Sequence, residues 1–254
     1  MPRFIGVVSG KGGVGKTTLV TNLSVALASE FSKKVSVIDC NITTPHLAMH
    51  FGLLFQKATL NDVLKGGATF EEAMYEHSSG VKVIPASLNL TDLVGVNILN
   101  LSSSLNDFFE EDDFVILDSA PGFGKEAISA LKACKEALII ATPDVPSIVD
   151  AIRLKNILSE LEVHPLGLVL NKVTGKKYEL NDNEITQLTG LPILAKIPFD
   201  PKIQESLTAK IPLVIYDPKR PTSREFFRLA AFLAAEEFKP KLSFFERIRR
   251  IFGI

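Results

Sequence analysis

Continuous apolar runs recur along the chain and are rich in valine and isoleucine. They cover residues 4–10, 34–39, 81–86, 114–118, 136–143, 165–172 and 192–198. Because apolar residues fill these runs without alternating with polar ones, we expect strands that are buried on both faces, as in a parallel sheet covered by helices. Helical patterns lie between the runs, for example over 16–30, 125–135, 146–161 and 222–237.

This alternation of strand and helix predicts the fold class α/β. We expect a doubly wound, mainly parallel sheet of about seven to eight strands with helices on both faces. The 254-residue chain is 46% apolar and 22% charged, which is typical of a globular protein with a sizeable core. Residues 1–237 are predicted to form one domain, and the segment 90–105 to contribute further helix within it.

Residues 238–254 are predicted to form a linker and a separate C-terminal helix, because Pro240 interrupts helical continuation. Ser243 and Glu246 have the spacing of a capping box that would start this helix. On a helix, the apolar residues fall on one side and the basic residues on the other. The residues concerned are Phe244, Phe245, Ile248, Ile251 and Phe252, and opposite them Arg249 and Arg250.

A helix of this length is about 16 Å long, roughly half of what a membrane span requires. A short, basic, amphipathic helix is typical of segments that lie in the interface of an anionic membrane. The alternative is a helix that docks on its own domain or on a partner protein.

The charge of the chain is unevenly distributed. Residues 239–254 sum to +4 and the whole chain to −1, which leaves −5 for the rest. An acidic body does not favour nucleic acid as a partner. Cys40 and Cys134 are isolated, so a paired-cysteine metal site within one chain is not expected. The first residues do not resemble a secretion signal, and together with the two cysteines this predicts a cytoplasmic protein.

The stretch "GKGGVGKT", residues 10–17, matches the phosphate-loop pattern G-x-x-x-x-G-K-[ST] and stands between a predicted strand and a predicted helix. The glycines allow backbone N–H groups to turn inward, and the helix start adds a positive dipole end. Lys16 is expected to neutralise phosphate charge, and the Thr17 hydroxyl to be a Mg²⁺ ligand. The predicted nucleotide-binding residues of the loop are Gly10, Lys11, Gly12, Gly13, Val14, Gly15, Lys16, Thr17 and Thr18.

Two aspartates end buried strands and are expected beside the phosphate loop. Asp39 follows "VSVI" and Asp118 follows "FVIL". Carboxylates at this edge of a parallel sheet can hold Mg²⁺ through water, so the predicted metal residues are Thr17, Asp39 and Asp118. A strand-end cap is the alternative for Asp39. After it, Thr44 and Pro45 predict a helix start.

The stretch "KGGVGKTT" resembles the deviant Walker A signature of the ParA/MinD family of P-loop ATPases, and the chain as a whole is most similar to MinD-like members. The resemblance implies ATP or ADP with Mg²⁺, and a homodimer that forms with ATP. It also implies that Lys11, which has no evident task within its own chain, reaches the partner's nucleotide. Lys11, Lys16 and Asn41 are the implied catalytic residues.

Some positions depart from the family's pattern. Asn41 stands where MinD-like proteins usually carry a water-orienting aspartate, and asparagine cannot accept a proton. We therefore expect an ATPase that is slow unless activated. Matching family positions imply an adenine pocket at Asn171, Pro198 and Asp200, although a strand-end asparagine is also a common turn residue.

The predicted function is an ATP-dependent dimerisation switch that cycles on and off the inner face of the cell membrane through its tail. It would position the cell-division site or another structure, with an activator or cargo protein as partner and without nucleic acid. The alternatives are a ParA-like DNA-partition ATPase, which would need a basic body, and an iron–sulfur carrier ATPase, which would need paired cysteines. A biosynthetic kinase on this fold is not favoured by Lys11.

Overall fold

The computed structural model describes residues 1–105 and 108–238. Eight strands form one sheet in the order β3-β4-β2-β5-β1-β6-β7-β8, and every neighbouring pair is parallel except β3–β4. The strands are β1 Arg3–Val8, β2 Val35–Asp39, β3 Tyr75–Glu76, β4 Lys82–Ile84, β5 Phe114–Asp118, β6 Glu136–Ala141, β7 His164–Val173 and β8 Ile193–Pro198. The predicted α/β fold class is confirmed. The two-residue β3 was not predicted, because a run that short carries no period.

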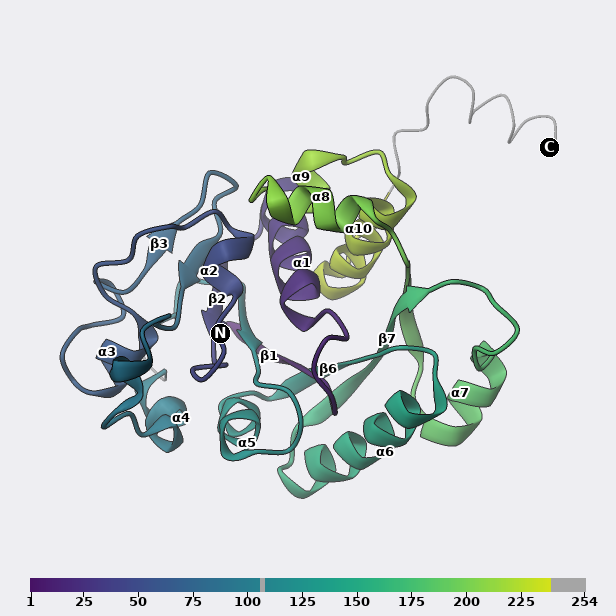
Figure 1. Cartoon of the computed structure of the whole chain (residues 1–254), viewed down its shortest axis with the longest axis horizontal. Helices are drawn as coiled ribbons and strands as arrows, with labels where there is room; N and C mark the ends of the chain where they lie inside the picture. The colour runs from purple at the N-terminus through teal and green to yellow at the C-terminus, as the bar shows by residue number, and fades with distance from the viewer. Residues whose placement is uncertain (106–107, 239–254) are drawn as a thin grey trace.

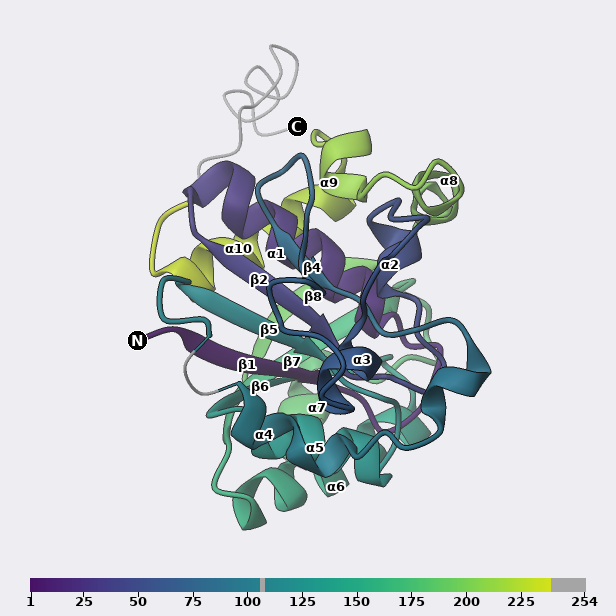
Figure 2. The ribbon, with the colours of Figure 1, turned by 90° about the vertical axis from the view of Figure 1, so that its left-hand side faces the viewer.

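Helices cover both faces of the sheet (Figure 1). On one face lie α1 (Lys16–Phe31) and α10 (Pro221–Ala234), with α2 (Leu47–His50), α8 (Lys202–Thr208) and α9 (Leu213–Tyr216) near them. On the other face lie α4 (Leu101–Ser104), α5 (Lys125–Lys132), α6 (Val145–Glu160) and α7 (Asp182–Thr189). Helix α3 (Leu60–Leu64) begins beside the end of β4, where the Leu60 N–H donates to Pro85 O. Figure 2 shows the strands running nearly side by side between these layers.

The apolar runs are continuous because each strand serves two cores. Ile5 and Val7 of β1 pack into the cluster under α1 and α10, whereas Val8 belongs to the cluster on the α5 and α6 side. Gly6 also faces that second side, where a Cβ would lie 3.2 Å from Cys134 Sγ. Successive side chains of a strand point to opposite faces, so a sheet covered twice needs apolar residues at nearly every position.

The segment 90–105 differs from the predicted helix. It forms two 3₁₀ helices, η1 (Leu90–Leu93) and η2 (Ile98–Asn100), followed by the four-residue α4. Gly95 has φ 81°, a left-handed conformation that ends a helical run. No helix within residues 1–105 and 108–238 is long and apolar enough to cross a bilayer.

The direction of strand order changes at β1, whose neighbours are β5 on one side and β6 on the other. In open parallel sheets, ligands bind at the carboxyl ends of the strands where such a reversal leaves a crevice. Here that edge carries the chain segments after Val8, Asp39, Asp118 and Val173. The fold therefore brings the predicted phosphate loop, which contains Thr17, and the two predicted metal-site aspartates to one edge.

Candidate functional site: a nucleotide cleft at the sheet edge

The phosphate loop joins β1 directly to α1. Gly13 and Gly15 have φ 77° and 100°, conformations that side-chain-bearing residues adopt only with strain. A Cβ on Gly15 would in addition lie 2.3 Å from Asn171 Nδ2. Lys16 is buried, and its Nζ donates a hydrogen bond of 3.0 Å to Ser9 Oγ. Burial lowers the pKa of Lys16, and the nearby Asp118 and Asp39 oppose this shift.

The hydrogen bonds of the loop suit it to an anion. Four of its carbonyls are engaged, those of Lys11, Gly13, Val14 and Gly15. Among the described residues, no backbone N–H from Lys11 to Thr17 donates to another protein group. Loop N–H groups without a protein acceptor, next to a helix start and a buried lysine, fit a phosphate chain.

Thr17 and Asp118 form the centre of the predicted metal site. Thr17 Oγ1 donates to Asp118 Oδ2 at 2.6 Å, and Asp118 Oδ1 is buried without a hydrogen-bond partner in the described part of the chain. Burial raises the pKa of Asp118 to about 6, against the opposing effects of Thr17 and Lys16. A hydroxyl and a buried carboxylate with a free oxygen fit Mg²⁺ and its waters. Bound there, the ion would neutralise phosphate charge.

Asp39 lies opposite Asp118 in the register of β2 and β5, but its oxygens are already engaged. They accept the backbone N–H groups of Asn41 and Leu47, each at 3.1 Å. Burial raises its pKa well above the ordinary value, and the charge of Asp118 adds to the shift. Asp39 thus fixes the turn into α2, which agrees with the alternative prediction of a strand-end cap. Its position opposite Asp118 also fits a contact to Mg²⁺ through a bound water.

Asn41 closes a turn with Thr44. Its Nδ2 donates to Thr44 O at 2.7 Å, and its Oδ1 accepts from Thr44 Oγ1 at 3.1 Å. The expectation that Thr44 and Pro45 start a helix was wrong. Helix α2 begins at Leu47 with His46 before it, because the Thr44 hydroxyl bonds back to Asn41 rather than forward.

Lys11 has a partner within its own chain, so the expectation that it has no such task was wrong. Its Nζ lies 2.9 Å and 3.2 Å from the two carboxylate oxygens of Asp144. Asp144 is also the N-cap of α6, where it accepts the N–H of Ser147, and it accepts the Thr142 hydroxyl. Although burial acts to raise the pKa of Asp144, the bonds from Thr142 and Lys11 lower it overall.

The predicted adenine-pocket residues share one cleft with the phosphate loop. This cleft has a volume of about 380 Å³ and is lined by Gly12, Gly13, Gly15, Lys16, Thr17, Thr18, Asn41, Asn171, Lys172, Pro198, Phe199 and Asp200 among others. Asn171 Nδ2 donates to Val14 O at 2.7 Å, and its buried Oδ1 has no hydrogen-bond partner among the described residues. An unpaired acceptor at this depth fits a ligand with an N–H donor.

Asp200 lines the cleft, but its carboxylate has other partners. It accepts from Arg220, with Nη2 at 2.8 Å, from the Thr222 hydroxyl and from the Lys202 N–H. The Arg220 guanidinium is the largest cause that lowers the pKa of Asp200 to about 2. The direct role of Asp200 is therefore to hold the loop after β8 in place. The pattern had not pointed to Phe199, which is 61% exposed beside it.

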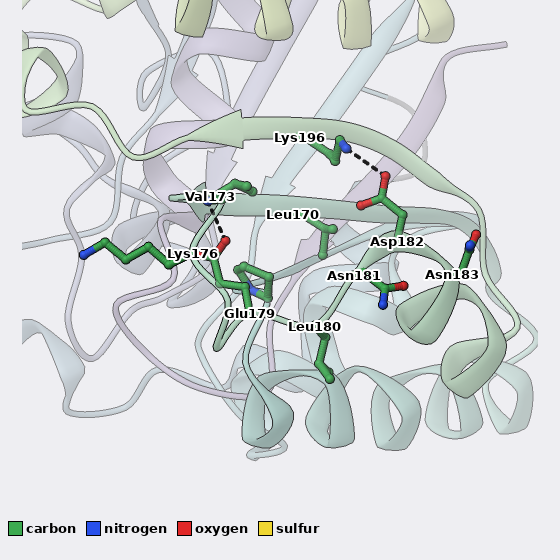
Figure 3. A pocket seen from close by; sticks show the side chains of 11 residues that line it. Leu170, Val173, Lys176, Glu179, Leu180, Asn181, Asp182, Asn183 and Lys196 are labelled. Carbon is green, nitrogen blue, oxygen red and sulfur yellow. Dashed lines mark hydrogen bonds and ion pairs between the residues drawn. The ribbon is translucent and has the colours of Figure 1, made fainter.

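A second cavity of about 610 Å³ lies behind β7, between its end and α7 (Figure 3). Leu170 and Val173 line it, whereas the intervening Asn171 and Lys172 line the nucleotide cleft. Its charged residues are used locally. Lys196 pairs with Asp182 at 2.7 Å, and Glu179 accepts from Thr174 and Gly175. The cavity is larger than the nucleotide cleft, but Lys196, Asp182 and Glu179 are already engaged in these contacts.

The fold and the cleft together define a P-loop NTPase. The chain belongs to the ParA family of these proteins: the family profile described as "NUBPL iron-transfer P-loop NTPase" matches residues 1–234. An uncharacterized ATP-binding protein of Methanocaldococcus jannaschii is 34% identical over 259 residues, covering 100% of this chain and 98% of its own length.

Two solved MinD structures are similar throughout. Septum site-determining protein MinD of Pyrococcus horikoshii, complexed with Mg-ADP, is 31% identical with a TM-score of 0.88, over 92% of this chain and 96% of that one. The MinC:MinD cell division complex of Aquifex aeolicus is 28% identical with a TM-score of 0.83, over 94% and 99%. The predicted family, ATPase class and Mg²⁺–nucleotide cofactors are confirmed, and the chain is a MinD/ParA-type ATPase.

Proposed function

We propose that this ATPase is a dimerisation switch that cycles on and off an anionic membrane surface and positions a cellular structure, as a MinD-like protein would. The observation that carries the proposal is Lys11, a second lysine in the phosphate loop. Its side chain is 39% exposed, and within residues 1–105 and 108–238 it forms one ion pair, with Asp144. The likeness to MinD proteins over nearly the whole chain supports it.

In this proposal the loop N–H groups and Lys16 bind the phosphates, while Thr17 and Asp118 hold Mg²⁺ and its waters. Asp39 contributes through those waters and keeps the turn to α2 in place. Asn41 orients the attacking water by hydrogen bonds but takes no proton from it, so turnover without an activator is slow. Nδ2 and Oδ1 of Asn41 each make one hydrogen bond to Thr44, which leaves a second N–H and a second lone pair for the water.

Lys11 must leave Asp144 before it can reach a nucleotide held by a second copy. The pair is exposed, with side chains 39% and 42% accessible. Exposed ion pairs contribute only about 0.2–1 kcal/mol. A γ-phosphate with its greater charge would therefore compete well for the lysine, and ATP would favour the dimer over the monomer.

Adenine selectivity is proposed to rest on Asn171, with Pro198 and Phe199 as the apolar wall. The Oδ1 of Asn171, which has no hydrogen-bond partner in the described part of the chain, would accept a hydrogen bond from an adenine N–H. Asp200 takes part through Arg220 and the loop that they hold, not by direct contact.

The tail residues Phe244, Phe245, Ile248, Arg249, Arg250, Ile251 and Phe252 lie outside the described residues, as does nearly all of the proposed 238–254 appendage. Their amphipathic pattern supports a membrane role at the inner, cytoplasmic face. One tail would bind weakly, whereas two tails on a dimer gain about 10²–10⁴ in avidity. The proposal also includes an activator or cargo protein as a partner of the ATPase.

The test of the switch measures the oligomeric state of the protein with each nucleotide. Sedimentation velocity with a non-hydrolysable ATP analogue should give a dimer, and ADP a monomer. Lys16→Ala should give a monomer with both, because the phosphates lose their buried cation. A wild-type protein that stays monomeric with the analogue would contradict the switch.

The iron–sulfur carrier remains the second candidate, because the matching family profile is described by iron transfer. The described residues include no group of three or more histidine, cysteine, aspartate or glutamate side chains that could hold a metal ion. Both cysteines are buried, and burial raises the pKa of each thiol. A carrier of this kind would need a cluster held between copies, and anaerobic reconstitution followed by absorption spectroscopy would detect it.

A further inference from the structure

We propose that Asn171 and Lys172 act together as a prop that orients the phosphate loop, with Lys172 as a positioning residue for nucleotide binding. The two residues are consecutive at the end of β7, and they bond to consecutive carbonyls of the loop. Lys172 Nζ donates to Gly13 O at 2.6 Å, and Asn171 Nδ2 donates to Val14 O at 2.7 Å.

Because the peptide bond is planar, a contact that fixes a carbonyl also fixes the direction of the next N–H group. In a trans peptide, the C=O of one residue and the N–H of the next point in opposite directions. Fixing Gly13 C=O toward Lys172 therefore turns the Val14 N–H away from Lys172. Fixing Val14 C=O toward Asn171 does the same for the Gly15 N–H. Two adjacent N–H groups are thus aimed before any anion arrives.

The backbone of β7 is shaped for this contact. Lys172 has φ 57°, a left-handed conformation that is uncommon for residues other than glycine, and the β7–β8 register is irregular between Leu170 and Val173. Strained residues of this kind persist where the surroundings enforce them, often at ligand sites. The twist lets Asn171 and Lys172 both reach the loop, although neighbours in a regular strand point to opposite faces.

Other loop carbonyls are fixed in different ways. Lys11 O accepts from Ser9 Oγ at 2.8 Å, and Gly15 O accepts from Leu19 N at 2.9 Å within the first turn of α1. Those contacts are local in sequence. The prop is the long-range part, 157 and 159 residues away from its targets, and it couples the last strands of the sheet to the loop after the first.

The inference rests on the nucleotide-binding function, and its test uses Lys172→Met, which keeps the side-chain length but removes the donor. Titration calorimetry with Mg-ADP and with inorganic pyrophosphate should give affinities about threefold to tenfold below wild type for both. In the ligand-free protein, the amide ¹⁵N resonance of Val14 should shift. The Gly13 carbonyl, which shares a peptide bond with the Val14 nitrogen, loses its hydrogen bond from Lys172. Lys176→Met is the matched control. It removes the same charge from a lysine that lines the second cavity rather than the phosphate loop, and it should change neither quantity.

A direct charge contact between Lys172 and the phosphates would give a different pattern: weaker binding with an unmoved Val14 resonance in the free protein. That pattern, or wild-type affinities in Lys172→Met, would overturn the prop. Lys172→Gly suits the left-handed φ and serves as the second variant should Lys172→Met fold poorly; it should lose affinity equally. A wild-type protein that binds neither probe would contradict the nucleotide site, while the Val14 resonance would still report on the prop.

Discussion

Lys11 and Asp144 are 133 residues apart in the sequence, yet their charged groups meet at 2.9 Å beside the phosphate loop. In the proposed dimerisation switch, Lys11 has two competing partners, Asp144 of its own chain and the nucleotide of a second copy. Asp144→Asn removes the competing charge and preserves the N-cap of α6, since asparagine caps helices as well as aspartate does.

We expect Asp144→Asn to strengthen ATP-dependent dimerisation by about 1.5-fold to fivefold, which corresponds to the worth of an exposed ion pair. Lys11→Ala should bind ATP normally and remain monomeric. Sedimentation equilibrium with a non-hydrolysable analogue measures both. Weaker dimerisation of Asp144→Asn would mean that the pair belongs to the dimer rather than opposing it.

The buried Asp118 makes stability depend on pH. Its folded pKa of about 6 lies above the ordinary 3.8, so the folded state holds its proton more tightly than the unfolded chain. The resulting stability is present below the unfolded pKa and is lost as pH rises through about 6. Asp118→Asn should therefore raise the free energy of unfolding at pH 8 by up to about 3 kcal/mol, with the gain vanishing near pH 4.

Urea unfolding in EDTA without nucleotide measures this gain, because a bound metal would reverse the effect of the carboxylate charge. Asp112→Asn is the control, since Asp112 is also buried but pairs with Lys82 at 3.0 Å and Ser36 at 2.6 Å. That variant should lose stability at pH 8. An Asp118→Asn protein that is destabilised equally at both pH values would point to lost packing instead of charge burial.

Asn41→Asp tests water activation. The change replaces the donor to Thr44 O with a charged acceptor, so the turn of residues 41–44 should loosen and free the carboxylate toward the cleft. We expect the single-turnover rate of ATP hydrolysis to rise by about tenfold or more, because a positioned base contributes up to about 10²–10⁴. Asn41→Ala, which opens the same turn without a base, should not gain rate. Equal rates in all three proteins would show that another group orients the water.

The sequence predicted those parts of the site whose chemistry is local. The phosphate loop is one continuous motif, and Asp39 and Asp118 are each marked by the apolar strand before them. Lys11–Asp144, Lys172–Gly13 and Arg220–Asp200 were not predicted, because they join distant segments and any lysine or arginine can make such a bond. Asp200 is an example. Its position in the cleft was predicted, but the hydrogen bonds from Arg220 to its carboxylate were not.

The segment 90–105 shows a related limit. Its leucines and valines fit a helical period, but Gly95 and the caps from Asn89 and Asn97 divide it into two short 3₁₀ helices. Five of its eight large apolar residues are exposed or only partly buried, so a helical period in the sequence does not show which residues are buried. The Asn89 and Asn97 side chains accept local hydrogen bonds from backbone N–H groups, and these bonds determine the conformation there.

The tail provides the last prediction. The full-length protein should co-sediment with liposomes that contain anionic lipid when ATP is present, and much less with ADP, because only the dimer offers two tails. Burying five large apolar side chains yields about 7–12 kcal/mol gross, and ordering the helix costs a comparable amount, so a single tail binds marginally. Deleting residues 241–254 should abolish co-sedimentation and leave nucleotide affinity intact, since the phosphate loop and its contacts lie within the described domain.

Two variants separate the apolar from the electrostatic contribution. Ile251→Glu puts a charge on the apolar side of the predicted helix and should act like the deletion. Arg249 and Arg250 both changed to Ala should weaken binding and make it less sensitive to salt and to anionic lipid, because each basic residue near such a surface contributes about 1 kcal/mol. Persistent ATP-dependent binding after the deletion would assign the membrane contact to the folded domain. If the intact protein fails to co-sediment with liposomes with either ATP or ADP, the alternative of a helix that docks on protein would be favoured.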